Sequence, residues 1–346
     1  MYYIFIMGGG TGPVALEKIY ITNIGNNTVT VLNPDDTDTT NAITWTGFSN
    51  PRTIAAYNDK IYVLNQNTVS VFNADDGNDT NVSDAITWTG FTNPNYIAAY
   101  NEKIYIIDHD ELGPDPDYVF VFNANDGNDT NVSDAITWTG FVSANGIAAY
   151  NGKIYVSDRN IEIPDTVHVF NANDGNDTNG DDVITWRGFS APFGIAAYND
   201  KIYVANQGDQ RVRIFNSDDG NDSTLSIIWG MTEYQSTITA YNNKIYLPVE
   251  VSDYVDVFNA DDGNAATPSI IWTGPYDPSE AAAYNGKIYV TNLASNSVSV
   301  FDENAPNDST PYMTWTGFDS PYGIAAYNSL HPEGNLYIDA SGSNVV

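Results

Sequence analysis

A short phrase recurs along this chain, and its spacing limits the possible folds more than any other feature does. Copies include "AAYNDKIYV", "AAYNEKIYI", "TAYNNKIYL" and "AAYNGKIYV". The seven tryptophans follow the same rhythm, 43 to 50 residues apart, at Trp45, Trp88, Trp138, Trp186, Trp229, Trp272 and Trp315. A period of about 40 to 50 residues that contains several strands is typical of a β-propeller, in which each repeat forms one blade.

One repeat reads as four short strands. In residues 281–317 the segments "AAAY", "KIYV", "VSVF" and "MTWTG" are rich in strand-forming residues, and the joints are rich in Gly, Asn and Asp. The "NG" between the first two segments is typical of a two-residue hairpin turn. No segment has a helical period. The sequence therefore predicts an all-β protein: a single seven-bladed β-propeller of four-stranded antiparallel blades, with Trp and Tyr side chains packed between blades.

The two ends of the chain contain more strand-forming segments than a closed propeller needs. The first blade, residues 18–46, lacks an inner strand, and residues 323–327 can supply it and close the circle. The segments 2–6 and 335–346 are then surplus terminal strands. We expect an N-terminal extension over 1–13, the propeller over 14–334 and a surplus C-terminal strand over 335–346.

Surplus strands expose backbone donors and acceptors unless they find a partner. Donation to the next propeller would give a head-to-tail filament or layer, and this self-association is the expectation we favour. One alternative is a monomer in which both segments pair within one subunit. Another is a truncated chain whose repeats continue.

The seven lysines all occupy one position of the repeat, directly after the hairpin turn. They are Lys18, Lys60, Lys103, Lys153, Lys201, Lys244 and Lys287. In a propeller the turns between strands one and two share a face with the loops between strands three and four. We therefore expect a ring of lysines among acidic loops such as residues 73–84. Either each lysine offsets its acidic neighbours, or the ring docks another subunit.

Composition excludes several classes of function. The net charge of −32 argues against nucleic-acid binding and against anionic membrane surfaces. The chain has no cysteine, so it has neither disulfides nor thiolate metal sites. No stretch reaches the length of a membrane span, and the start "MYYIFIMGGG" lacks the basic region of a signal peptide.

Two stretches carry a family resemblance. "KIYVTNLASNSVSVFDE", residues 287–303, and "KIYITNIGNNTVTVLNP", residues 18–34, resemble the YVTN family of β-propeller repeats. That family is known from surface-layer and secreted proteins, so the resemblance implies a propeller and an extracellular or cell-surface location. Other repeats depart from the motif ("YVLN", "YIID", "YVSD", "YVAN", "YLPV"), and no ligand-binding residue carries over.

Acidic loops such as "DDGNDT" offer oxygen-rich side chains around a glycine, which is the chemistry of calcium sites. Their spacing differs from that of an EF-hand, and the alternative is a solvated turn. Calcium is the one cofactor we consider. The candidate ligands are Asp75, Asp76, Asn78, Asp79, Asp126, Asn128, Asp129, Asp174, Asn176 and Asp177.

Asn-x-Ser/Thr sequons are frequent and fall in expected turns, which suits a glycosylated surface protein. Chance is the rival explanation in a chain so rich in Asn and Thr. The candidate glycosylation sites are Asn26, Asn78, Asn81, Asn128, Asn131, Asn176, Asn221 and Asn307.

The sequence offers little support for catalysis. The three histidines, His109, His168 and His331, lie in unrelated repeat positions, and no Ser/His/Asp arrangement can be argued. Glu280 is an exception near the axis, because it replaces a glycine of other inner strands. Two insertions, residues 108–118 and 158–166, lengthen loops on the face opposite the lysines, where a ligand rim would lie.

Three functions follow. We favour a non-catalytic extracellular or cell-surface structural protein, and expect no enzyme activity. The first alternative is a glycan- or protein-binding propeller that uses the two lengthened loops. The second is a lactonase-like hydrolase with polar groups that converge near Glu280.

Overall fold

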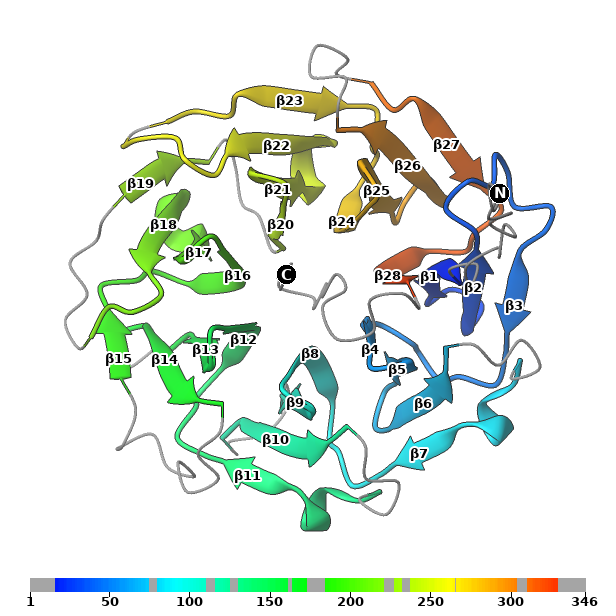
Figure 1. Ribbon diagram of the computed structural model, residues 1–346, viewed down its shortest axis with the longest axis horizontal. Helices are drawn as coiled ribbons and strands as arrows, with labels where there is room; N and C mark the ends of the chain where they lie inside the picture. The colour runs from blue at the N-terminus through cyan, green and yellow to red at the C-terminus, as the bar shows by residue number, and fades with distance from the viewer. Residues whose placement is uncertain are drawn as a thin grey trace, which may run out of the picture.

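Seven four-stranded sheets surround a common axis in the computed structural model of the protein (Figure 1). Each sheet is an antiparallel meander whose first strand lies nearest the axis and whose fourth lies at the periphery. The prediction of an all-β, seven-bladed propeller is confirmed. The structure describes residues 16–74, 80–109, 116–124, 130–160, 164–172, 184–220, 227–231, 237–264, 266–303 and 310–328.

Every blade runs from an inner strand at the axis to an outer strand at the periphery. Blade 1 consists of β28 (Pro321–Asn328), β1 (Glu17–Asn23), β2 (Thr28–Leu32) and β3 (Ile43–Trp45). Blades 2 and 3 consist of β4 (Ile54–Tyr57), β5 (Lys60–Leu64), β6 (Val69–Asn73), β7 (Ile86–Trp88), β8 (Pro94–Tyr100), β9 (Lys103–Asp108), β10 (Tyr118–Asn123) and β11 (Ile136–Trp138).

The remaining blades follow the same order. Blades 4 and 5 consist of β12 (Ala144–Tyr150), β13 (Lys153–Asp158), β14 (Thr166–Asn171), β15 (Ile184–Arg187), β16 (Pro192–Tyr198), β17 (Lys201–Asn206), β18 (Arg211–Asn216) and β19 (Ile227–Gly230). Blades 6 and 7 consist of β20 (Thr239–Tyr241), β21 (Lys244–Val249), β22 (Tyr254–Asn259), β23 (Ile270–Thr273), β24 (Pro278–Tyr284), β25 (Lys287–Asn292), β26 (Ser297–Asp302) and β27 (Met313–Thr316). Short 3-10 helices are η1 (Val82–Asp84), η2 (Val132–Asp134), η4 (Gln207–Asp209) and η5 (Glu250–Ser252).

The circle closes through blade 1, as the sequence predicts. β28 pairs antiparallel with β1, with Ile324 opposite Ile21 and Ala326 opposite Ile19. The last described strand thereby supplies the inner edge of the first blade. The surplus strands expected over 2–6 and 335–346 lie outside the described residues.

Each blade packs against the next through its tryptophan. Trp138 of blade 3, for example, stacks on Phe170 of blade 4, with ring centroids 4.2 Å apart and planes 11° apart. The same stack recurs at five further joints. At the joint between blades 7 and 1 the phenylalanine position is Leu32, which packs in one cluster with Trp315. The predicted aromatic packing between blades is confirmed.

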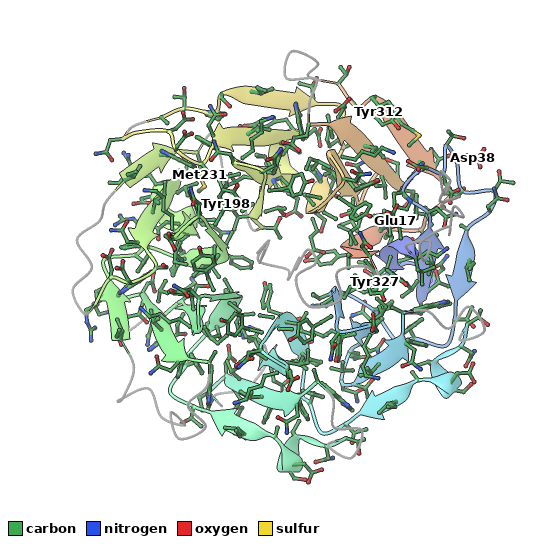
Figure 2. All side chains as sticks on the ribbon, viewed as in Figure 1. Glu17, Asp38, Tyr198, Met231, Tyr312 and Tyr327 are labelled. Carbon is green, nitrogen blue, oxygen red and sulfur yellow. The ribbon has the colours of Figure 1, made fainter. Side chains whose placement is uncertain are left out.

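The propeller has two faces, the turn face and the entry face. The turn face carries the hairpins between strands one and two, where residues such as Asn199 (φ 50°) and Asp200 (φ 60°) adopt the left-handed conformation expected of a type I′ turn. The entry face carries the other ends of the inner strands. On the turn face the tyrosine that ends an inner strand contacts the hairpin of the following blade: Tyr198 Oη accepts a hydrogen bond from the Asn243 amide (2.9 Å), and Tyr327 donates to Asp59 Oδ1 (2.5 Å; Figure 2).

In several blades the recurring lysine also reaches the following blade, whereas Lys18 and Lys60 donate to Asn33 and Asn73 of their own blades. Lys153 Nζ and Tyr155 Oη both donate to the carbonyl oxygen of Ser217, over 2.8 and 2.7 Å. Lys287 and Tyr289 share the Pro34 carbonyl oxygen in the same way, over 3.0 and 3.2 Å. The Lys-x-Tyr motif is therefore a joint between blades. Docking of another subunit by the lysine ring stays a prediction.

A pair of tyrosine variants measures this joint. We expect Tyr155→Phe to lower the free energy of unfolding by about 1 kcal/mol, because a buried hydrogen bond is lost. Tyr62→Phe is the matched control: Tyr62 is the equivalent buried residue of blade 2, and its hydroxyl has no hydrogen-bond partner in the part of the chain that the structure describes. Urea unfolding gives both values. Equal effects of the two variants would contradict a stabilising role for the shared carbonyl.

Candidate functional site

Polar and aromatic side chains gather where the inner strands begin on the entry face. In five of these strands a register shift follows the first residue, so the next one or two residues leave the regular ladder. These positions differ from blade to blade, whereas the following aliphatic residues are nearly constant. We use the term axial cluster for eight polar or aromatic residues at these positions and at the equivalent position before β4: Arg52, Asn95, Tyr96, Asn145, Phe193, Ser279, Glu280 and Tyr322.

Hydroxyl groups of the preceding blade fix the backbone of this cluster. Thr22 Oγ1 donates to the Arg52 carbonyl oxygen over 2.6 Å. Thr291 Oγ1 donates to the Tyr322 carbonyl oxygen over 2.7 Å, and Thr53 Oγ1 donates to the Asn95 carbonyl oxygen over 2.7 Å. The main chain that carries the cluster is thus held by side chains of rigid strands, which is what a preorganised binding site requires.

An aromatic pair spans blade 4. The rings of Tyr96 from blade 3 and Phe193 from blade 5 meet edge to face, with centroids 6.0 Å apart and planes at 83°. Gly146 makes this possible, because a Cβ there would lie only 2.3 Å from the Phe193 carbonyl oxygen. Both aromatic side chains are partly exposed. Beside them, Asn145 Nδ2 donates to the Ser143 carbonyl oxygen (2.7 Å), which leaves Oδ1 as an acceptor.

The opposite side of the cluster carries its charges. Glu280 is only 2% exposed, and its Oε2 accepts a hydrogen bond from the Ile324 amide over 2.9 Å. Burial raises the pKa of Tyr322, the nearby Glu280 carboxylate raises it further, and Arg52 acts in the opposite direction. Arg52 Nη1 also donates to Asn95 Oδ1 over 3.4 Å. The cluster therefore combines one cation, one buried carboxylate, amides and a phenol.

More acids lie beside the cluster on blades 6 and 7. Burial raises the pKa of Glu250, and Asp277 adds to that effect. Burial likewise raises the pKa of Asp277, and repulsion from the Asp253 carboxylate raises it further. Asp253 Oδ1 also accepts a hydrogen bond from the Asp277 amide over 2.8 Å. Glu250 also raises the pKa of Tyr322, so this acidic group joins the axial cluster electrostatically.

The raised pKa of Glu250 gives a pH-dependent prediction. The folded state disfavours its ionised form, so stability is lost as the pH rises through the folded pKa. Glu250→Gln should therefore raise the melting temperature at pH 7, and the gain should vanish near a pH of about 3.5, where the wild-type carboxyl is protonated. Glu102→Gln, at a hairpin on the turn face, is the control. A gain that persists unchanged in acid would show that Glu250 is not the titrating group.

The two described histidines contact structural aspartates. His109 Nδ1 lies 2.6 Å from Asp117 Oδ2, and the same oxygen accepts the Ala144 amide hydrogen bond (2.7 Å). His168 Nε2 lies 3.4 Å from Asp158 Oδ2. Their aspartates hold the start of blade 4, and His168 Nε2 also lies 3.0 Å from Thr166 Oγ1. His331 lies outside the described residues.

The lengthened loops hold neighbouring strands where the structure describes them. In residues 158–166, Asp165 accepts the Asn160 amide over 2.7 Å and the Ala191 amide of blade 5 over 2.5 Å. Asp117, in the 108–118 loop, holds Ala144 at the start of blade 4. The ends of both loops therefore position strands that carry Asn145 and Phe193.

All ten candidate calcium ligands lie outside the described residues. Within the described ranges, no group of three or more His, Cys, Asp or Glu side chains is placed to hold a metal ion. Of the glycosylation candidates, Asn26 is exposed, whereas Asn81 and Asn131 cap η1 and η2 and donate through Nδ2 to Thr46 and Thr89 of the preceding blades, both over 3.0 Å. Asn78, Asn128, Asn176, Asn221 and Asn307 lie outside the described residues.

Of the axial cluster, sequence reasoning singled out only Glu280. The others were missed because each looks like ordinary drift at one repeat position. The available signal was their shared location: the two residues before the constant aliphatic residue vary in chemistry while the flanking positions do not.

Fold and cluster together define a seven-bladed propeller with a polar, aromatic site near its axis. Similar architecture occurs in a "putative 6-phosphogluconolactonase" from Bacteroides fragilis (TM-score 0.68, 14% identity, 92% of this chain and 100% of that one). It also occurs in a functionally unknown protein from Desulfotomaculum acetoxidans (TM-score 0.68, 15% identity, 89% of this chain and 98% of that one). A third example is apo AztD from Citrobacter koseri (TM-score 0.60, 12% identity, 91% of this chain and 98% of that one). No protein-family model and no curated protein matches the chain.

These likenesses correct the function favoured from sequence. A non-catalytic structural protein that assembles into a filament is contradicted, because the similar propellers fit the alternatives of a binding module or a lactonase-like hydrolase better. The expected filament depended on terminal strands, whereas the cluster places chemically varied groups near the axis. Among the described residues, no helix is long and apolar enough to cross a membrane.

Proposed function

We propose that the axial cluster binds a sugar-like ring and that this protein is a glycan-binding propeller. The observation that carries the proposal is the partly exposed Tyr96–Phe193 pair beside the Oδ1 acceptor of Asn145. Aromatic rings pack against the apolar C–H face of a sugar, and amides and charged groups pair with its hydroxyls. Both kinds of group occur here within neighbouring inner strands.

The polar part of the cluster suits hydroxyl groups. Asn145 supplies an acceptor, Asn95 supplies its Nδ2 donors, and Arg52 supplies a guanidinium fork. A hydroxyl both donates and accepts, so it can satisfy such a mixed set. A purely apolar ligand would leave the Asn145 Oδ1 acceptor without a hydrogen bond from the ligand, at a cost of about 1 to 3 kcal/mol.

A glycan array followed by calorimetry on the hits tests this proposal. Phe193→Ala and Asn145→Ala should each weaken the best hit by about tenfold or more, which corresponds to about 1.4 kcal/mol. Tyr312→Ser is the matched control, because Tyr312 is a 54% exposed tyrosine at the periphery (Figure 2). The absence of any hit, or equal losses in all three variants, would refute sugar binding at the cluster.

A second candidate is hydrolysis of a sugar lactone at the same place. Glu280 favours it: a buried carboxylate oriented by the Ile324 amide can serve as a general base for water, with Arg52 to stabilise the developing oxyanion. The test is hydrolysis of D-glucono-1,5-lactone above its spontaneous rate. Glu280→Gln should lower kcat by roughly 10²- to 10⁴-fold. Wild-type protein that does not exceed the spontaneous rate would exclude this activity.

Further sequence predictions stay open and need their own tests. Membership of the YVTN family implies an extracellular or cell-surface location, and fractionation of the native cells would decide this. Intact mass of the native protein would show glycosylation, with Asn26 the most exposed described candidate. Calcium binding by the acidic loops would show as a melting temperature that falls on addition of a chelator.

A further inference from the structure

We infer that the axial cluster selects an uncharged sugar ring and rejects its phosphate ester. This inference deepens the proposed function and rests on it. It concerns the charge of the ligand, because the aromatic and amide groups do not determine whether the ligand is neutral or charged. It follows from how cations and acids are distributed between the two faces.

The lysines are committed to the other face of the propeller. Lys153 and Lys287 donate to carbonyl oxygens of the following blade at the hairpin turns, and Lys244 does the same to the Glu303 carbonyl oxygen over 2.9 Å. Strand connectivity places every lysine of the repeat at that end of its blade. A ligand phosphate at the entry face therefore meets no lysine among the described residues.

The arginines leave one cation in the axial cluster and a second one beside it. Arg213 pairs with Asp209 Oδ2 over 2.5 Å on blade 5, and Arg187 and Arg211 stand at the ends of a fourth and a third strand. Arg159 follows a second strand, and its amide donates to the Ser143 carbonyl oxygen over 2.9 Å, so it lies beside the cluster. Arg52 alone belongs to the described axial cluster. Its backbone is held next to that of Gly323, because Thr22 Oγ1 bonds both the Arg52 carbonyl and the Gly323 amide (2.6 and 2.8 Å).

Carboxyl groups outnumber these two cations. Glu280 is buried, and Thr291 Oγ1 bonds the carbonyl oxygens of both Glu280 and Tyr322, over 3.2 and 2.7 Å, so the acid and the phenol are carried by adjacent strand starts. Glu250 acts on the same phenol from blade 6. Glu280, Glu250 and Asp277 therefore give three carboxyl groups at or beside the cluster. The cations there are Arg52 and Arg159, and the whole chain carries a net charge of −32.

A phosphate ester brings close to two negative charges and acceptor oxygens that require cations or multiple donors. Placed beside these carboxylates it would meet repulsion in a partly desolvated site, where charges are screened less than in water. A neutral sugar meets no such penalty, because carboxylates accept hydrogen bonds from its hydroxyls. Charge therefore discriminates between two ligands of almost the same shape.

Matched pairs of probes test this: glucose, galactose and mannose, each against its 6-phosphate, by calorimetry at low and high salt. We expect each 6-phosphate to bind at least tenfold more weakly than its parent sugar, with a smaller gap at high salt. The double variant Glu250→Gln/Glu280→Gln should narrow the gap. Glu250→Gln alone should reduce this difference in affinity in part, so the test still works if a variant with Glu280→Gln does not fold. Glu102→Gln on the turn face is the control and should leave the difference unchanged.

The outcomes separate this inference from the proposed function. Charge selection is overturned if a phosphate ester binds as tightly as its parent sugar. It is also overturned if the difference in affinity between the two changes neither with salt nor in the Glu variants. Sugar binding stands in both cases. Failure of all six probes together with a blank glycan array overturns both. A large difference in affinity between each sugar and its 6-phosphate, which becomes small in the glutamine variants, supports the inference.

Discussion

Replacing Gly146 with alanine is expected to lower the free energy of unfolding by about 3 kcal/mol, at the upper end of the range for overpacking. The new Cβ would lie 2.3 Å from the Phe193 carbonyl oxygen and 3.0 Å from Ser157 Oγ. The first neighbour is main chain and cannot rotate away, so blade 5 must shift. Since Phe193 moves with it, the variant should also lose sugar binding.

Gly263→Ala is the control for this variant. A Cβ at Gly263 would meet nothing within 4 Å, so the same chemical change should have little effect there. Urea unfolding of both variants measures the difference. Equal stabilities would mean that the contact between blades 4 and 5 yields easily and that the aromatic pair is not held rigidly.

Replacing Asp158 with alanine is expected to have a similar cost, roughly 3 kcal/mol. Asp158 is 3% exposed, and its Oδ1 accepts the amide hydrogen bonds of Val142 and Ser143 over 3.0 and 2.8 Å. Removing the carboxylate leaves two donors unsatisfied, each worth about 1.5 to 3 kcal/mol when bonded to a charged group. Asn145 lies just beyond Ser143, so its position should loosen as well.

The chain contains its own rescue for this variant. At the same strand end of blade 5, Asn206 Oδ1 accepts the Ser190 amide over 2.8 Å. Asp158→Asn should therefore recover most of the loss, because Oδ1 is retained and only the contact with His168 changes. Similar losses for the alanine and asparagine variants would show that the ionic contact, and not the amide hydrogen bonds, gives the stability.

The fold could be predicted because each repeat has residues with the same conformational preferences at equivalent positions. The hairpin residues need the left-handed conformation, and the alternating apolar residues need two buried faces. The missing inner strand of blade 1 predicts closure by residues 323–327, which lie within β28. What the sequence left without a role was the residue that ends strand two. The structure shows that Asp108 and Asp158 there accept backbone amides of the loop before the inner strand.

The candidate site was harder to predict, since it depends on contacts between blades that are distant in sequence. Tyr96 and Phe193 are separated by a whole blade, and they meet only because Gly146 lacks a side chain. Glu280 was visible as an exception in a glycine position, but its neighbour Tyr322 comes from the far end of the chain. Repetition hides such groups, because each differs from its equivalents without forming a motif.

Three kinds of contact between blades run in one direction along the chain. Lys153 and Tyr155 reach forward to Ser217, Thr22 reaches forward to Arg52, and Trp138 stacks forward on Phe170. At the closing joint, Thr291 of blade 7 reaches Tyr322 of blade 1 by the same rule. Such a joint depends on which blade comes next around the circle and not on which peptide links the two. The propeller consequently has no obligatory first blade, and a circular permutant opened at the hairpin of residues 151–152, where Asn151 is exposed, should assemble the same circle from a different starting point.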